Sequence, residues 1–179
     1  MKRNFYRILC AFVFVGAFSA TPVATAQTKD PIVSIRQQYA AINKNASRYK
    51  TVKKPLTGFS LEGGEMTAYF DGPAVVKIAA IHFGESGRTV EEYYFQQDKL
   101  IFVFEKVLKY SFPLSGKVVS TRENRFYFQN GKMIRWLGPN GKRSRADAAE
   151  YAEKETEHRD VSNLLINGAR STLADVEAP

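Results

Sequence analysis

Residues 126–137 read FYFQNGKMIRWL, and they decide the fold class. Apolar and aromatic residues flank Asn130-Gly131 on both sides. Both central residues of a type I′ turn need a positive φ, which Asn and Gly adopt at the lowest cost. The stretch therefore predicts two antiparallel strands joined by a two-residue turn.

A second segment repeats this pattern 33 residues earlier, where residues 93–101 read YYFQQDKLI. Both segments place an aromatic-Tyr-Phe-Gln run before two turn residues, and then Lys and two apolar residues. We therefore predict a second hairpin of the same design, with Gln97-Asp98 as its turn. Because a two-residue turn fixes the register, Phe95 is expected opposite Leu100 and Tyr127 opposite Ile134.

Outward from these hairpins, residues rich in β-branched and aromatic side chains are interrupted by turn residues about every 8–12 positions. Connections this short favour antiparallel neighbours, since parallel strands need longer crossovers. The expected strands lie near 65–70, 74–83, 88–96, 99–109, 120–129 and 132–137.

Helices are predicted on either side of the strands. Asp30-Pro31 is a typical helix start, and apolar residues follow at spacings of three and four over 31–49. A second helix is expected from Ser144, capped with Asp147, to Asn167-Gly168, followed by a loose tail over 170–179. The predicted fold class is α+β: a single antiparallel meander sheet of about six strands packed with an N-terminal and a C-terminal helix.

The first 26 residues have the features of a signal peptide. Residues 2–7 are basic, residues 8–20 are mostly apolar, and Ala24-Thr25-Ala26 provides a cleavage site after Ala26. The alternative is an uncleaved N-terminal anchor. Cleavage predicts a periplasmic or secreted domain over 27–179, and it lowers the formal net charge from +8 to about +5. It also removes Cys10, the only cysteine, so that disulfides and thiolate zinc sites are not expected.

Strand alternation divides the side chains of the hairpins between two faces of the sheet. One face collects mainly Phe and Leu side chains and is interpreted as core. The other is apolar but carries phenol, indole and guanidinium groups, which suit a glycan, a peptide or a protein partner. Its candidate ligand-binding residues are Tyr94, Arg125, Tyr127 and Trp136, with Glu92 as an acceptor. The alternative is that one of the two helices covers this face.

Catalytic patterns are not found. His82 and His158 lie far apart without metal-ligand spacing, and no Gly-x-Ser-x-Gly motif occurs. Glu91-Glu92 is a poor acid–base pair, because neighbouring residues of a strand point to opposite faces. We therefore expect no catalytic residues, no metal and no cofactor.

The segments 63–65, 91–95, 100–104 and 123–137 resemble bacterial exported proteins of unknown function, and the hairpins are loosely similar to MORN repeats. The resemblance covers residues 30–168 and implies a compartment, but no activity.

Together these features predict a non-enzymatic periplasmic or secreted binding protein for a cell-envelope glycan, a peptide or a protein. One alternative is an inhibitor or immunity protein that masks a hydrolase or toxin. Another is a hydrolase that uses carboxylates near Glu65, Asp71 and Glu92. Nucleic acid is not an expected partner, and an integral membrane protein is not expected after signal cleavage.

Overall fold

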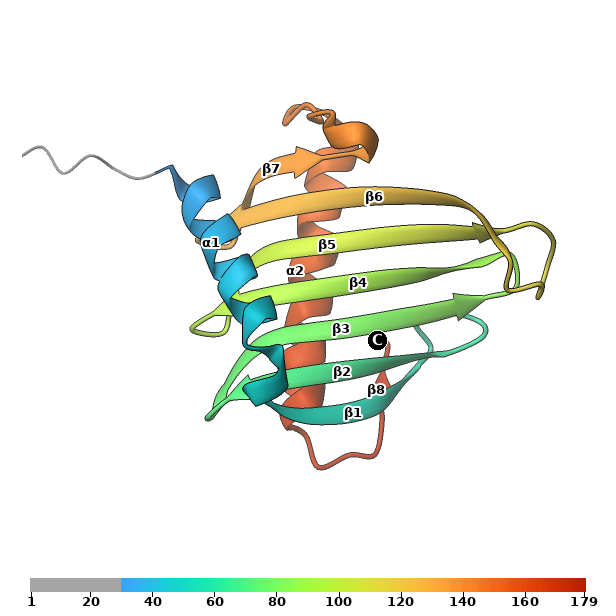
Figure 1. Cartoon of the computed structure of the whole chain (residues 1–179), viewed down its shortest axis with the longest axis horizontal. Coiled ribbons are helices and arrows are strands. Elements are labelled where there is room, and N and C mark those ends of the chain that lie inside the picture. The colour runs from blue at the N-terminus through green and yellow to red at the C-terminus, as the bar shows by residue number, and fades with distance from the viewer. Residues whose placement is uncertain (1–29) are drawn as a thin grey trace, which may run out of the picture.

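The computed structural model describes residues 30–179, so the predicted signal peptide and its cleavage site lie outside the described residues. An eight-stranded sheet has the order β7-β6-β5-β4-β3-β2-β1-β8, and each neighbouring pair is antiparallel except β1 and β8 (Figure 1). The α+β class is confirmed, but the sheet has eight strands where about six were predicted. The strands are β1 (Lys50–Thr57), β2 (Gly64–Asp71), β3 (Ala74–Gly84), β4 (Gly87–Gln96), β5 (Lys99–Tyr110), β6 (Val118–Gln129), β7 (Lys132–Leu137) and β8 (Val176–Glu177).

Two helices lie on opposite faces of the sheet, so the structure has three layers (Figure 1). Helix α1 (Pro31–Lys44) packs its buried isoleucines on one face, and α2 (Ala149–Arg170) crosses the other. Two separate apolar cores result. The core under α1 contains Ile32, Ile35, Ile42, Tyr94, Ile101, Phe102 and Tyr127. The larger core under α2 includes Tyr93, Phe95, Val103, Phe126, Phe128, Trp136 and Leu165.

The prediction of the first helix is confirmed at its start. The Asp30 carboxylate accepts a hydrogen bond from the Ile32 amide at 2.9 Å, and Pro31 occupies the first turn. The helix ends earlier than expected, at Lys44, and a short 3-10 helix, η1 (Ala46–Arg48), continues the chain. The Asn45 side chain folds back onto the Ala41 carbonyl at this break.

The start of the second helix was predicted too early. Asp147 binds Arg145 through both carboxylate oxygens and caps no amide, and the helix begins at Ala149. At the other end the helix continues through Gly168 to Arg170. A Cβ on Gly168 would lie 2.5 Å from Cγ2 of Val176, so this glycine allows close approach of β8.

Two strands were not predicted, and the tail expected to be loose forms one of them. Strand β8 pairs with Leu56 and Thr57 at the end of β1. Strand β1 was missed because its residues KTVKKPLT are polar. Its Lys54 is buried, and the ammonium group donates to the carbonyls of Ser171 and Leu173, each at 2.7 Å. A lysine that looked like a linker residue therefore ties β1 to the segment after α2.

Both predicted hairpin turns are present, but each hairpin carries a β-bulge directly after the two residue pairs that flank its turn. The register shifts between Tyr94 and Phe95 in one hairpin, and between Tyr127 and Phe128 in the other. Tyr127 therefore lies opposite Arg135, where Ile134 was predicted. Because side chains alternate with a period of two, a shift of one residue exchanges the faces of every side chain beyond it.

Candidate functional site

The face predicted to bind a ligand is covered by α1. Tyr94 is fully buried, and its hydroxyl donates to the Glu92 carboxylate at 2.7 Å and contacts the side chain of Asn43 in α1. Glu92 also accepts from the Lys77 ammonium at 2.6 Å. Burial and the hydrogen bond to Glu92 raise the pKa of Tyr94 far above its ordinary value. The polar groups of these side chains form hydrogen bonds with one another and with α1. This agrees with the alternative that a helix covers the predicted ligand face.

Tyr127 and Arg125 reach the edge of the covered face. With Arg36 and Tyr39 of α1 they line a pocket of about 480 Å³, which we call the α1 pocket. Nε of Arg36 lies 3.5 Å from the Tyr127 hydroxyl, and Arg125 lies over the ring of Phe104 while it pairs with Glu123. The structure therefore brings two of the predicted residues together.

Trp136 was placed on the wrong face. It lies opposite Phe126, and its ring packs 5.3 Å from the Phe126 ring in the core under α2. The bulge at Ile134 is the physical reason, because it turns the residues after it to the other side. The predicted stacking of Arg125 on Trp136 is therefore wrong.

The carboxylates proposed for the hydrolase alternative are not gathered into one site. Glu65 and Asp71 lie six residues apart in β2, and the third, Glu92, lies beyond β3 in β4 and is paired with Lys77.

A second pocket lies between the sheet and α2, on the face where no ligand was predicted. Its volume is about 710 Å³, and we call it the α2 pocket. Residues of β3, β4, β5 and β6 form its floor, the segment Phe59-Ser60 closes one side, and α2 contributes Lys154, Glu157 and Val161. The strands extend past the middle of α2, which leaves this part of the sheet uncovered (Figure 1).

Strand register arranges the floor of the α2 pocket in rows across the sheet. The row nearest the core contains Ala80, Glu91, Glu105 and Asn124. The next row outward contains His82, Thr89, Val107 and Arg122, and Lys109 follows two residues after Val107. The acidic row is buried, whereas Arg122 and Lys109 are exposed. The pocket therefore has an acidic floor and a basic outer edge.

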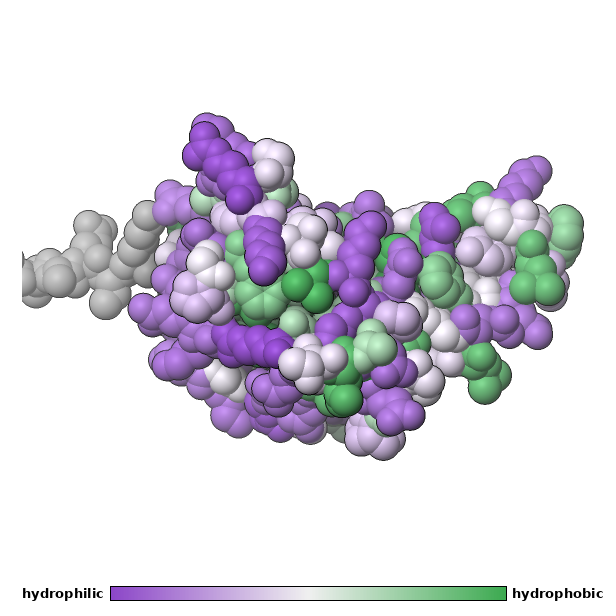
Figure 2. Space-filling model, turned by 90° about the horizontal axis from the view of Figure 1, so that it is seen from below, coloured by the Kyte–Doolittle hydropathy of each residue, from purple (hydrophilic) through white to green (hydrophobic). Residues whose placement is uncertain are grey.

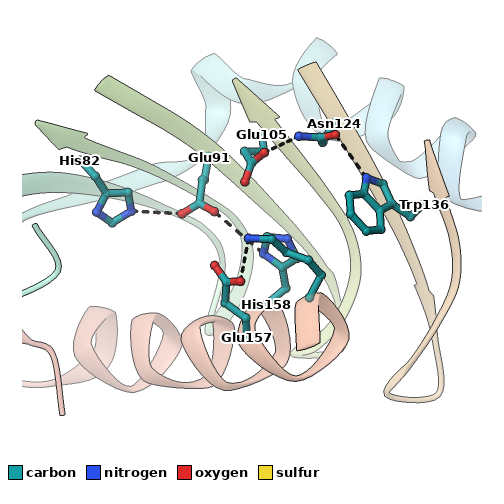
Figure 3. A network of polar contacts seen from close by, with 8 residues as sticks. His82, Glu91, Glu105, Asn124, Trp136, Glu157 and His158 are labelled. Atoms are coloured by element: carbon teal, nitrogen blue, oxygen red, sulfur yellow. Dashed lines mark hydrogen bonds and ion pairs between the residues drawn. The ribbon is translucent and has the colours of Figure 1, made fainter. Parts of the chain in front are cut away.

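Glu91 is at the centre of the acidic row (Figure 3). One carboxylate oxygen lies 3.1 Å from Nε2 of His82, and the other lies 3.9 Å from Nδ1 of His158. Burial opposes ionisation and is the largest single effect, but the hydrogen bond with His82 and the interactions with His158 and Tyr93 together outweigh it and lower the pKa of Glu91. Glu91 is therefore an anion at neutral pH, and His82 donates Nε2–H to it. Nδ1 of His82 is buried and has no hydrogen-bond partner.

Glu105 lies directly opposite Glu91 on the neighbouring strand. Its side chain accepts a hydrogen bond from Asn124, whose own oxygen accepts from the Trp136 indole at 3.2 Å (Figure 3). Burial raises the pKa of Glu105, and the charge of Glu91 adds to this effect. Two carboxylates in one row thus have pKa values shifted in opposite directions, which is typical of functional sites.

Helix α2 adds a cation and a neutral ring to the site. Lys154 pairs with Glu157 at 2.7 Å and both residues line the α2 pocket, where Glu157 faces the acidic row (Figure 3). His158 is fully buried between Tyr93 and Phe126, and neither ring nitrogen has a hydrogen-bond partner. Burial lowers the pKa of His158, so that its ring is neutral at pH 7. Three carboxylates then face one lysine, and the site has a negative net charge.

Sequence reasoning did not find this site. His82 and His158 were set aside because they are 76 residues apart, and Glu91 because it neighbours Glu92 in sequence. A hairpin without a bulge would place Phe104 opposite Glu91, and the shift after Tyr94 brings Glu105 there instead. One signal was available in the sequence. Glutamates are rare in strands rich in apolar and aromatic residues, and two neighbouring predicted strands each contain one at Glu91 and Glu105.

No protein-family model, curated protein or solved structure matches the chain. Within residues 30–179, no helix is both long and apolar enough to span a membrane. In the same range, no three or more His, Cys, Asp or Glu side chains are grouped so that they could hold a metal ion.

Proposed function

We propose that this protein is an exported, non-enzymatic binding protein whose α2 pocket binds a short zwitterionic peptide. The observation that carries the proposal is the buried pair Glu91 and Glu105 at the floor of an open pocket. A second carboxylate beside an ionised one destabilises the unliganded fold, because both charges have lost hydration. The presence of this second carboxylate is explained if a cationic group of a ligand binds to both carboxylates.

A primary ammonium group fits the acidic floor. It has three N–H donors, and the floor offers the carboxylates of Glu91 and Glu105 as acceptors. The net negative charge of the floor attracts the ligand cation, and burial strengthens the ion pair relative to one at the surface. The peptide N-terminus would therefore lie against Glu91 and Glu105.

The basic edge of the pocket selects the other end of the ligand. Arg122 lies two residues from Asn124 along β6, and Lys109 lies four residues from Glu105 along β5. At about 3.3 Å per strand residue, these cations are roughly 7 and 13 Å from the acidic row. An extended peptide spans a similar rise per residue, so two to four residues bridge the distance. Phe59 and Val161 supply apolar walls for its side chains.

Isothermal titration calorimetry with three forms of trialanine tests this proposal. The free peptide is expected to bind, and N-acetylation, which removes the ammonium charge, is expected to weaken binding at least tenfold. The C-terminal amide should bind more weakly than the free acid because it loses the contact with Arg122 and Lys109. Equal affinity for the free and the acetylated peptide would refute the placement of the ammonium group.

Two matched variants connect the binding to the pocket. Glu105→Gln keeps the acceptor for Asn124 but removes the charge, and we expect it to abolish most of the peptide affinity. Glu65→Gln is the control, because Glu65 is an exposed carboxylate on β2 outside the pocket lining. A loss of affinity in both variants, or in neither, would contradict the assignment.

A further inference from the structure

The distal ends of β5 and β6 protrude beyond both helices, and a loop over residues 111–117 joins them (Figure 1). Of the eight large apolar side chains exposed within residues 30–179, six lie at this end of the sheet. Phe112 is 65% exposed and Leu114 is 75% exposed, and the others are Leu61, Phe83, Val118 and Val119. Hydrophobic side chains project among hydrophilic ones at this end of the molecule in Figure 2. We call residues 111–117 the tip loop.

The tip loop is held in a defined shape. The Leu114 amide donates to the Glu85 carbonyl at 2.7 Å, and the Ser111 amide donates to the Lys117 carbonyl at 2.9 Å. Leu114 has a φ of 60°, a left-handed conformation that is unfavourable for a bulky side chain. Such strain persists only where the surroundings impose it, and here it presents Leu114 to solvent. The exposure of Phe112 and Leu114 is therefore built into the loop.

The charges around the tip loop are mostly positive, and the acidic exception is Glu85, whose carbonyl accepts from the Leu114 amide. Residues 106–122 contain Lys106, Lys109, Lys117 and Arg122 and no acidic residue. Within the described residues, Lys109, Lys117 and Arg122 form no ion pair. Large apolar side chains at the end of a protrusion, with unpaired cations behind them, match the layers of an anionic bilayer, whose apolar interior lies beneath charged headgroups.

We infer that the tip loop docks this protein on a membrane by inserting Phe112 and Leu114 below the headgroups of an anionic lipid surface. Lys117 then lies at the level of the phosphates. An acidic protein partner fits less well, because stable protein interfaces bury about 800 Å² on each side, whereas the loop is a narrow projection. This inference goes beyond peptide binding, since Phe112, Leu114 and Lys117 do not line the α2 pocket.

Vesicle co-sedimentation tests the inference with the processed chain that begins at Gln27, which contains both cores complete. Vesicles of phosphatidylcholine with about a third phosphatidylglycerol are compared with pure phosphatidylcholine. We expect binding to the anionic vesicles that falls as salt is raised, because each cation near the surface contributes about fivefold to partitioning. Absence of binding to anionic vesicles at low salt would overturn the inference.

Matched substitutions distinguish insertion of the tip loop from nonspecific hydrophobic adsorption to vesicles. The double variant Phe112→Ser/Leu114→Ser should lower partitioning at least tenfold, and Lys117→Glu should lower it more at low salt than at high salt. Leu173→Ser is the control, because Leu173 is 69% exposed but lies in the segment between α2 and β8. Unchanged binding by the double variant, or an equal loss with Leu173→Ser, would overturn the inference. Thermal unfolding of all variants should be unchanged, since the replaced side chains are exposed.

Discussion

The same conservative substitution at Glu91 and Glu105 is expected to change stability in opposite directions. Glu105 has lost hydration, and the charge of Glu91 lies next to it, so its ionised form destabilises the unliganded fold. Glu105→Gln removes the charge, keeps the acceptor for Asn124 and preserves the volume. We expect a gain of about 1 kcal/mol at pH 7, within the ~0.5–2 kcal/mol typical of single stabilising substitutions. For a chain of this size, that gain raises the Tm by about 2–4 °C.

Glu91→Gln has the opposite expected sign. The Glu91 carboxylate accepts a charge-assisted hydrogen bond from His82, which is the contact that keeps its pKa low despite burial. Hydrogen bonds to charged groups contribute about 1.5–3 kcal/mol, and relief of the buried charge offsets part of the loss. We therefore expect a net destabilisation of about 1–2 kcal/mol at pH 7.

Urea unfolding followed by Trp136 fluorescence measures both effects, because this single buried tryptophan lies in the core beside the site. The gain from Glu105→Gln should grow as the pH rises above 4.5 and vanish well below it, since a raised pKa costs stability only where the unfolded carboxyl is ionised. The cost of Glu91→Gln should shrink at acid pH, as the lowered pKa of Glu91 is passed. If Glu105→Gln destabilises the fold at pH 7 as much as Glu91→Gln does, the assigned electrostatics are wrong.

Two further predictions concern the packing of α2. The pKa of buried His158 is lowered, so unfolding should become easier as the pH falls below 6.5, and His158→Gln should flatten this dependence in thermal melts at pH 7.5 and 5.5. An unchanged slope in His158→Gln would show that another group is responsible. Gly168→Ala should cost about 1–3 kcal/mol in urea unfolding, because its Cβ overlaps Val176, and Val176→Ala in the same chain should recover part of the loss. A single variant as stable as the wild type would contradict the close contact of α2 and β8.

The sequence predicts local features of this fold well where one short-range rule is sufficient. The Asp30-Pro31 start of α1 and its apolar spacing require only the geometry of a helix, and both are confirmed. The Asn130-Gly131 turn has the expected positive φ at both positions, and so does Gln97-Asp98. Features that depend on distant segments were missed. Strand β1 is stabilised by Lys54, whose partners Ser171 and Leu173 are more than 100 residues away.

The turns were predicted correctly but the faces were not, because the bulges leave no simple mark in the sequence. In both hairpins the extra residue is an isoleucine after the turn, Ile101 in one and Ile134 in the other, at the same position of the 33-residue repeat. The two hairpins therefore share the position of their β-bulge as well as their sequence pattern. Each bulge exchanges the faces of the residues beyond it, and the core under α1 contains Phe102 as a consequence.

The bulge at Ile101 creates the observed acidic pair, as the equivalent bulge at Ile134 moves Trp136 off the predicted ligand face. If Ile101 paired opposite Tyr94 and no bulge formed, Phe104 would lie opposite Glu91, and Glu105 would point toward α1. With the bulge, Glu105 points toward α2 and lies opposite Glu91 in a row that ends at Asn124. A deletion of Ile101 should therefore remove the bulge but keep the acidic pair, because the residues beyond position 101 retain their partners on β4. The position of a single residue in one hairpin thus links the covered aromatic face to the charge of the pocket behind it.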